Sequence, residues 1–320
     1  MGSVHPLKRF IYHHKLTTKL YNIYRNYNRD KRNKMSDEDF AHWRHIFRTG
    51  RDLDLDNPRT FNEKIWWLKL YDRNPLKTIC TDKYRLQEYV KECGLGHICN
   101  EIYGVYDSFD EIPFDELPDR FYIKCNHTSG CNIIYDRSKP FDFVYYKNEF
   151  DFWMQRNYFW GSREYNYKDI VPKIICEKVL EDKEGNLPAD YKVMCFHGEA
   201  KLMFLGNNLA GKDGAHSGCG YCDVFDRDFN WIPILDERPH YTEKPIEKPD
   251  NYETMFQYAE ILGKPFRHVR VDFYDVDGKI YIGEMTFNHG GGCQDLQPEE
   301  WALKMGDWIS LDGIERIKQE

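Results

Sequence analysis

The chain has 320 residues, of which 16% are aromatic and 31% charged, and this composition excludes a disordered protein. It has no apolar N-terminal segment and no apolar run long enough to span a bilayer, so we expect a cytoplasmic protein whose ten cysteines are reduced. The net charge is −8, but residues 1–34 carry nine basic residues and one acid, and the acidic remainder argues against nucleic-acid binding.

The basic arm, residues 1–34, places apolar and aromatic side chains such as Phe10, Leu16 and Tyr21 between its cations. Two interpretations remain open. In the commoner case such a helix packs one face on its own domain. In the other case it lies on the anionic inner face of a membrane or contacts a partner such as a glycosyltransferase.

Residues 35–120 are predicted to form a mainly helical region without a cluster of catalytic residue types. The clearest helix start is T-F-N-E, in which Thr60 can cap the helix and Glu63 can reach back to complete a capping box. Helices are expected over residues 36–50, 60–74 and 82–94, and a strand over 102–106.

The pattern changes in residues 121–180, which we expect to form an α+β subdomain. Lys124 ends a strand, and the turn that follows, Thr128-Ser129-Gly130, has small residues that let backbone N–H groups approach phosphate oxygens. A lysine beside a turn is more often structural, so this feature alone is weak evidence for a phosphate site. An aromatic helix over 150–160 and a buried strand that becomes polar at Glu177 complete this region.

Residues 181–320 form the last expected α+β region, and two of its strands carry charged residues. Asp190 and Lys192 lie two positions apart on the first of these strands, so they share one face.

The second is part of a hairpin over residues 270–286, in which Asp277-Gly278 supplies the tight turn. Its Asp272 points away from the apolar neighbours, and at the open end Asp272 and Glu284 lie beside Arg270. Taken alone, this group fits either a Mg²⁺ site with a phosphate-binding cation or a surface ion pair.

Taken together, the ordered motifs resemble the TupA-like (teichuronopeptide-biosynthesis) branch of the ATP-grasp superfamily, which is often found among bacterial surface-polysaccharide genes. The resemblance covers roughly residues 55–310. It rests on T-F-N-E-K-I, D-K-Y, K-C-N-H-x-S-G, D-Y-K-V, R-V-D-F-Y, G-E-M-T-F, G-G-G and P-E-E-W-A-L-K-M-G-D-W. It implies an α+β ATP-grasp fold, with two lobes that clasp ATP, after a helical N-terminal region. Residues 121–180 would be the lid subdomain and 181–320 the subdomain with the metal site.

The resemblance also implies an ATP site. Lys124 would contact the phosphates under a flexible loop from His127 to Asn132, an adenine hinge would use mainly backbone groups, and Asp190 would bind the ribose. The residues implied to contact ATP are Lys124, His127, Thr128, Ser129, Gly130, Glu177, Lys178, Val179, Leu180, Asp190 and Lys192.

By the same resemblance, Asp272 and Glu284 would hold Mg²⁺, with two ions expected. Arg270 and Lys124 would be catalytic, and Arg270 would steady the transferred phosphoryl group or the acyl phosphate. Most ATP-grasp enzymes have an asparagine two residues after the second acid, where this chain has Thr286. The third ligand is therefore either Thr286 or Asn288.

The implied activity is an ATP-dependent carboxylate–amine ligation through an acyl phosphate, in capsule or surface polysaccharide synthesis. The carboxylate would be a uronic acid, in a polymer or a nucleotide-sugar precursor, and the amine an amino acid or a small amino alcohol. Two alternatives remain. The first is a kinase or a glycosyltransferase. A glycosyltransferase that uses a sugar nucleotide would need a D-x-D metal motif, and D-L-D-L-D at residues 52–56 has that spelling. Its position between helices favours a solvated turn. The second is a non-catalytic nucleotide-binding scaffold.

Overall fold

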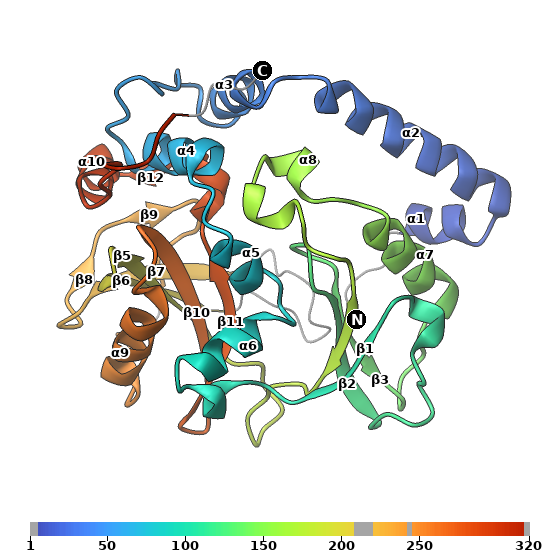
Figure 1. The fold of residues 1–320 in the computed structure, drawn as a ribbon. Coiled ribbons are helices and arrows are strands. Elements are labelled where there is room, and N and C mark those ends of the chain that lie inside the picture. The colour runs from blue at the N-terminus through green and yellow to red at the C-terminus, as the bar shows by residue number, and fades with distance from the viewer. Residues whose placement is uncertain (1–5, 208–219, 242–244, 317–320) are drawn as a thin grey trace.

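The computed structural model describes residues 6–207, 220–241 and 245–316, in which a six-stranded and a four-stranded antiparallel sheet are surrounded by helices (Figure 1). The larger sheet has the order β11-β10-β5-β6-β7-β8, and the smaller sheet has the order β1-β4-β2-β3. The strands are β1 (Ile102–Tyr106), β2 (Arg120–Cys125), β3 (Asn132–Asp136), β4 (Ile174–Glu177), β5 (Asp190–Phe196), β6 (Glu199–Asn207), β7 (Tyr221–Asp226), β8 (Trp231–Ile232), β10 (His268–Val276) and β11 (Lys279–Thr286), with β9 (Leu235–Asp236) and β12 (Leu296–Gln297) pairing separately.

The helices lie around these sheets, and none in the described ranges is long and apolar enough to cross a membrane. They are α1 (Pro6–Tyr12), α2 (Lys15–Asn33), α3 (Asp37–Thr49), α4 (Phe61–Tyr71), α5 (Leu76–Thr81), α6 (Leu86–Glu92), α7 (Phe143–Met154), α8 (Phe159–Ser162), α9 (Tyr252–Gly263) and α10 (Glu299–Asp307), with 3₁₀ turns η1 (Gly96–Ile98), η2 (Phe109–Glu111), η3 (Tyr165–Tyr167) and η4 (His289–Gly292).

The expected capping box of α4 is confirmed, because Glu63 N–H donates to the Thr60 hydroxyl and the Glu63 carboxylate accepts from Thr60 N–H. The helix expected over 82–94 is present as the shorter α6, and the preceding α5 was not expected. Asp82 separates the two helices, since its backbone is extended and its carboxylate accepts from the backbone N–H of Tyr84 at 2.9 Å. The aromatic helix begins earlier than expected, at Phe143, where Asp142 caps it.

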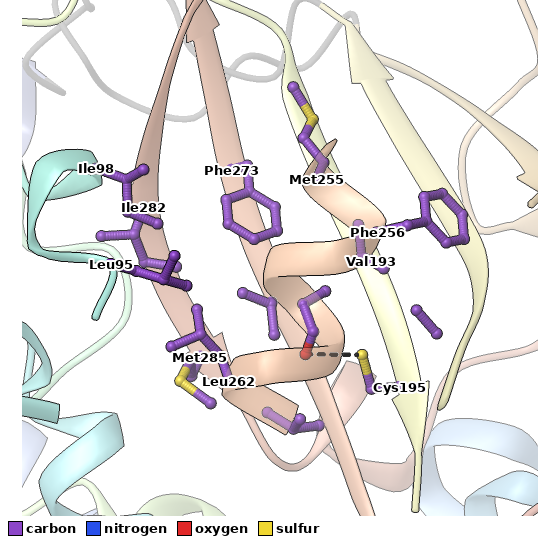
Figure 2. Close-up of a cluster of buried hydrophobic side chains, with 14 of the residues drawn as sticks. Leu95, Ile98, Val193, Cys195, Met255, Phe256, Leu262, Phe273, Ile282 and Met285 are labelled. Carbon is purple, nitrogen blue, oxygen red and sulfur yellow. Dashed lines mark hydrogen bonds between the residues drawn. The ribbon is translucent and has the colours of Figure 1, made fainter. Parts of the chain in front are cut away.

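The larger sheet is covered on both faces, and strand β5 illustrates how. Val193 and Cys195 face α9, with the Cys195 thiol donating to the Ala259 carbonyl at 3.4 Å (Figure 2). Met194 and Phe196 point the opposite way, into a cluster with α4. This alternation follows from the two-residue period of a strand. It places the expected polar pair of β5 on the same face as α4.

The β10–β11 hairpin contains a β-bulge that decides which side chains face the core. The register pairs Asp272 with Glu284 but Phe273 with Ile282, so Gly283 is an extra residue. A Cβ at Gly283 would lie 2.9 Å from the Tyr274 ring, which explains the glycine. Without the bulge, Ile282 and Glu284 would share a face. With it, Ile282 enters the core, while Glu284 faces Asp272.

The smaller sheet packs one face against α7 and presents the other to the larger sheet. Along β2, Phe121, Ile123 and Cys125 are buried in a cluster that includes Phe150 of α7. The intervening residues, among them Lys124, therefore point away from α7.

Helices α1 and α2 of the arm pack on their own domain, as one of the two interpretations expected. Lys8 pairs with Glu149 of α7 at 2.5 Å, and the Arg25 guanidinium lies 3.1 Å from the Phe152 ring centroid. The arm nevertheless leaves large apolar side chains 56 to 71% exposed, namely Leu7, Phe10, Leu16, Leu20, Ile23 and Tyr24.

Candidate active site

A cavity of about 170 Å³ lies between the two sheets. We call it the inter-sheet cavity. The smaller sheet contributes Tyr122 and Lys124, the larger sheet contributes Tyr274, and the corner between α5 and α6 contributes Lys83. Residues expected from the sequence that line this cavity are Lys124, Glu177, Lys178, Val179, Leu180, Asp190 and Glu284.

Two lysines in this region pair with neighbouring carboxylates. Lys124 lies 2.5 Å from Glu177 across the β2–β4 pair. Lys192 lies 2.7 Å from Asp190 and 3.8 Å from Asp272, so it joins the expected ribose acid to the expected metal acid. Lys192 itself does not line the inter-sheet cavity. Anionic phosphates near these lysines would compete with the carboxylates for the same cations.

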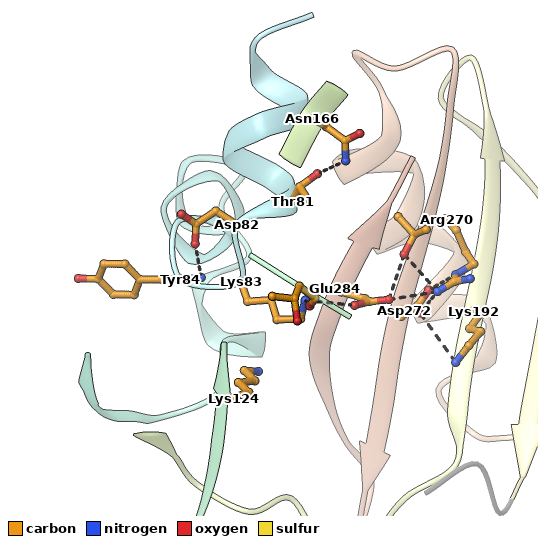
Figure 3. A network of polar contacts seen from close by, with 12 residues as sticks. Thr81, Asp82, Lys83, Tyr84, Lys124, Asn166, Lys192, Arg270, Asp272 and Glu284 are labelled. Atoms are coloured by element: carbon orange, nitrogen blue, oxygen red, sulfur yellow. Dashed lines mark hydrogen bonds and ion pairs between the residues drawn. The ribbon is translucent and has the colours of Figure 1, made fainter. Parts of the chain in front are cut away.

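Arg270 is at the centre of a buried polar network on the hairpin (Figure 3). Its guanidinium donates two hydrogen bonds to Asp272, both at 2.6 Å, and a further one to Glu284 at 3.2 Å. The Thr286 hydroxyl accepts from Arg270 at 3.1 Å and donates to Glu284 at 3.0 Å. The two carboxylates are thus held together by one planar cation whose fork matches carboxylate geometry.

The charges around these acids set their protonation. Burial raises the pKa of Asp272, whereas Arg270 lowers it. Burial would also raise the pKa of Glu284, yet three cations, Lys83 and Arg270 foremost, lower it to about 2. Glu284 is therefore ionised at neutral pH, and its side chain, 38% exposed, is the more open of the two. A carboxylate of this kind can bind a cation that enters from the inter-sheet cavity.

Lys83 is a further residue of the candidate site, and the sequence motifs had assigned it no role. Its ammonium lies 3.8 Å from Glu284 and donates to the Thr128 carbonyl at 2.8 Å, so it reaches both lobes (Figure 3). Burial lowers the pKa of Lys83, and Glu284 opposes that shift. The preceding Asp82 fixes the corner by accepting from Asn126 at 3.0 Å. The motif D-K-Y was the available signal, although the two neighbouring lobes were not evident from it.

The loop after β2 does not form the expected cradle inside the cavity. His127 is 2% exposed, and its ring contacts the Trp153 carbonyl at 3.0 Å and the Asn126 side chain at 3.1 Å. Thr128 is also buried, while Ser129 and Gly130 are exposed. None of these four residues lines the inter-sheet cavity, so a role in phosphate binding would require this loop to move.

Asn288, one of the two alternatives for the third metal ligand, turns away from the acidic pair. Its amide donates to Glu164 at 3.2 Å and to Asn166 at 2.9 Å. Asn166 in turn donates to the Thr81 hydroxyl at 2.8 Å. This chain of amides connects the end of the hairpin to η3 and α5. Thr286, whose hydroxyl contacts Glu284, is the better placed of the two alternatives.

The acidic pair fits a magnesium ion that is shared with phosphates. Within the described ranges, no group of three or more His, Cys, Asp or Glu side chains could hold a metal by itself. Asp272 and Glu284 nevertheless face each other across paired strands. Mg²⁺ prefers oxygen ligands and usually binds one or two carboxylates together with substrate phosphates. The donor set present here matches that mode.

Comparisons with known proteins give the family. A family model described as TupA-like ATPgrasp matches residues 63–310. No match was found among curated protein sequences. The solved structures to which the chain is similar include a D-alanine–D-alanine ligase of Bacillus anthracis complexed with ATP, with 16% identity over 65% of this chain and 54% of that chain and a TM-score of 0.34.

Another is an L-amino acid ligase of Bacillus licheniformis, with 11% identity over 67% of this chain and 44% of that chain and a TM-score of 0.40. A third is the ATP-grasp ligase PsnB complexed with a minimal precursor, Mg and ADP, with 11% identity over 70% of this chain and 57% of that chain and a TM-score of 0.36. The chain spans about half the length of these solved chains. Because the family model matches most of its residues, this protein belongs to the TupA-like ATP-grasp family and has the α+β ATP-grasp fold.

Proposed function

We propose that the protein is an ATP-dependent carboxylate–amine ligase that makes an amide through an acyl phosphate. The observation that carries this proposal is a group of charged side chains at the inter-sheet cavity. Lys83, Lys124 and Glu284 line the cavity, and Lys83 lies 3.8 Å from Glu284. Arg270 and Asp272 do not line it, but Arg270 donates to both Glu284 and Asp272. The acids can share a divalent cation with nucleotide phosphates, and the cations can bind phosphate oxygens. The family membership supports the same reaction class.

In the proposed reaction, a carboxylate oxygen of the substrate attacks the γ-phosphorus of ATP, and the bond to the β–γ bridging oxygen breaks to release ADP. The amine then attacks the acyl carbon, phosphate leaves, and the nitrogen loses a proton. Mg²⁺ would supply charge neutralisation on the phosphates. Lys124 and Lys83 would bind phosphate oxygens, and Arg270 would orient the transferred phosphoryl group by its planar fork. No protein nucleophile is required.

Within this class we propose a uronic acid of a surface polysaccharide, or its nucleotide-sugar precursor, as the carboxylate. An amino acid or a small amino alcohol would be the amine. The adenine would contact the segment Glu177–Leu180, and Asp190 would accept from the ribose hydroxyls. These assignments rest on the family resemblance, and on the position of the segment and of Asp190 along the inter-sheet cavity.

Trapping with hydroxylamine tests the reaction. With ATP, Mg²⁺ and a panel of uronic acids, an acyl phosphate gives a hydroxamate, whereas a phosphate ester made by a kinase does not react. We expect Arg270→Lys to reduce hydroxamate formation by about a hundredfold while the affinity for ATP changes little. Arg267→Lys is a matched control, because Arg267 donates to the Ser310 carbonyl at 2.9 Å and does not line the inter-sheet cavity. A stable phosphate ester without hydroxamate, or UDP release from a sugar nucleotide, would instead support the kinase or the glycosyltransferase.

We further propose that the arm holds the protein at an anionic membrane surface. Its exposed apolar side chains on α2, Leu16, Leu20 and Ile23, recur at helical spacing beside basic residues. This is the pattern of a helix that lies in the membrane interface. The intact protein should bind vesicles that contain phosphatidylglycerol, and less so at high salt. Leu16→Ser with Leu20→Ser should abolish that binding without loss of fold, and equal binding by both proteins would refute the proposal.

A further inference from the structure

A second cavity, of about 390 Å³, shares none of its described lining residues with the inter-sheet cavity. We call it the basic cavity. Its volume falls in the range of small-molecule sites. Its walls come from α3, α4, the segment from the end of α7 through α8, and the glycine turn η4 that follows the hairpin.

The charge of the basic cavity is opposite to that of the chain, whose net charge is −8. Arg44, Arg48, Lys69 and Arg156 line it, and its single acidic residue is Glu164. A concentration of cations in a concave site attracts anions, and guanidinium groups bind carboxylates and phosphates in a bidentate manner.

Lys69 is the buried member of this group, with only 4% of its surface exposed. Its ammonium donates to the Gly291 carbonyl at 2.9 Å and lies 3.4 Å from the Trp66 ring centroid. Burying an ammonium without a carboxylate in hydrogen-bonding contact is costly. Glu164 acts on Lys69 electrostatically without a hydrogen bond to it, and a substrate anion in the basic cavity would add a second negative charge.

Two tryptophans give the basic cavity a second chemical character. Trp153 lies in the last turn of α7, and Trp160 lies on α8, where 37% of it is exposed. The electron-rich face of an indole attracts the polarised C–H groups on one face of a sugar ring. Indole faces beside guanidinium groups suit a ligand that has both a ring of C–H groups and an anionic substituent.

The basic cavity is connected to the end of the hairpin that carries the proposed metal-binding acids. Its Glu164 accepts a hydrogen bond from Asn288, two residues after Thr286 of the metal hairpin. Burial is the main cause of the raised pKa of the cavity residue Tyr158, and the charges of Glu164 and Glu284 raise it further. The ligase proposal requires that a carboxylate bound here reach the γ-phosphate of a nucleotide in the inter-sheet cavity.

We infer that the basic cavity is the acceptor site and binds a saccharide that carries a carboxylate. This inference rests on the proposed ligase function and adds the residues that select the substrate. Arg44, Arg156 and Lys69 would bind the anionic group, and Trp153 and Trp160 would contact the sugar ring.

Binding of a probe pair to the intact protein tests the inference. Methyl β-D-glucuronide and methyl β-D-glucoside have the same ring but differ in the carboxylate. Titration calorimetry should show binding of the glucuronide, with the glucoside at least about tenfold weaker. Equal affinity for the two would overturn the inference, as would tighter binding of glucose 6-phosphate, because a phosphate would then be the preferred anion.

Single substitutions distinguish ligand binding in the basic cavity from ATP binding in the inter-sheet cavity. Arg44→Ala and Arg156→Ala should each weaken glucuronide binding by about tenfold and leave ATP affinity unchanged. Arg51→Ala is the matched control, since Arg51 follows the same helix as Arg44 but pairs with Glu299 outside the basic cavity. Unchanged glucuronide affinity in both cavity variants would overturn the inference.

The experiments can refute the ligase function and the saccharide site independently of each other. Arginine-dependent glucuronide binding without hydroxamate formation would refute the ligase function and retain the saccharide site. Hydroxamate formation with an unchanged KM for the uronic acid in Arg44→Ala would retain the ligase and refute the site.

Discussion

Lys69→Met should have opposite effects on two properties: it should maintain or increase the stability of the fold, and it should weaken the binding of an anion. The pKa of Lys69 is lowered by burial from its ordinary value of 10.5 to about 8, with Glu164 and Cys293 acting to raise it and Arg44 to lower it. At 1.36 kcal/mol per pKa unit, the charged form costs the folded protein about 3 kcal/mol at pH 7. Methionine keeps the chain length and removes this cost. It also leaves the Gly291 carbonyl without its donor, which costs about 1–3 kcal/mol.

We therefore expect Lys69→Met to be as stable as the wild type at pH 7, or more stable by up to about 2 kcal/mol. The sign of the pH dependence follows from the lowered pKa. Below about 8, Lys69 is charged in both the folded and the unfolded states and the cost is complete. Between about 8 and 10.5 the unfolded chain binds more protons, so the wild type gains stability relative to the variant as the pH rises.

Urea denaturation of both proteins at pH 7, 9 and 10.5, followed by tryptophan fluorescence, measures this difference. The wild type should gain about 3 kcal/mol relative to Lys69→Met across that range, because titrations common to both proteins cancel. Glucuronide affinity at pH 7 should fall by about tenfold in the same variant. If the difference in stability between the wild type and Lys69→Met did not depend on pH, the burial of a charged Lys69 would be refuted. If the two proteins bound the glucuronide equally, the role of Lys69 in binding would be refuted.

The remaining predictions concern the hairpin and the corner at Lys83. Asp272→Asn and Glu284→Gln should each lower ATP turnover by about a hundredfold or more while circular dichroism shows a retained fold, because each removes a metal-binding charge and keeps the shape; near-normal rates would exclude the metal assignment. Lys83→Met should raise the KM for ATP by about tenfold, and an unchanged KM would make Lys83 purely structural. Gly283→Ala should destabilise the protein by about 1–3 kcal/mol in urea, since its Cβ meets the Tyr274 ring at 2.9 Å, and wild-type stability would show that the bulge tolerates a side chain.

The structural features that could be predicted are those that depend on residues close together in the sequence. The capping box of α4 and the turn at Asp277-Gly278 are both present, the latter with positive φ values of 50° and 81°. Each depends on residues within a few positions of one another. The direction of Asp272, opposite to Val271 and Phe273, followed from the two-residue period of β10 and is also confirmed, because Asp272 contacts Arg270 while Val271 and Phe273 pack with α9.

The two-residue period of a strand could not predict that Glu284 faces Asp272. Simple alternation places Glu284 on the same side as Ile282, and only the bulge at Gly283 separates them. The sequence does contain the glycine, but a glycine in a strand has several possible meanings. The hairpin alone left Glu284 as either a metal ligand or part of a surface ion pair, and the ordered family motifs favoured the metal ligand.

Features that depend on distant contacts were missed for the same reason. Lys83 reaches the site because Asp82 is bound by Asn126, 44 positions later in the chain. Asn288 turns toward Glu164 and Asn166, which lie more than 120 positions earlier. Neither contact leaves a periodic or local pattern in the sequence. Sequence patterns therefore could not decide whether Asn288 has a structural role or binds a metal.

The bulge in the β10–β11 hairpin has a practical consequence for engineering. The bulge at Gly283 lies between the paired carboxylates, at the open end of the hairpin, and the tip at Asp277-Gly278. Residue pairs added at the tip would lengthen the ribbon outward and leave the acids opposite each other. Exposed turns of this kind accept inserted sequences readily. The hairpin tip is therefore a suitable position for a peptide tag or a small reporter domain.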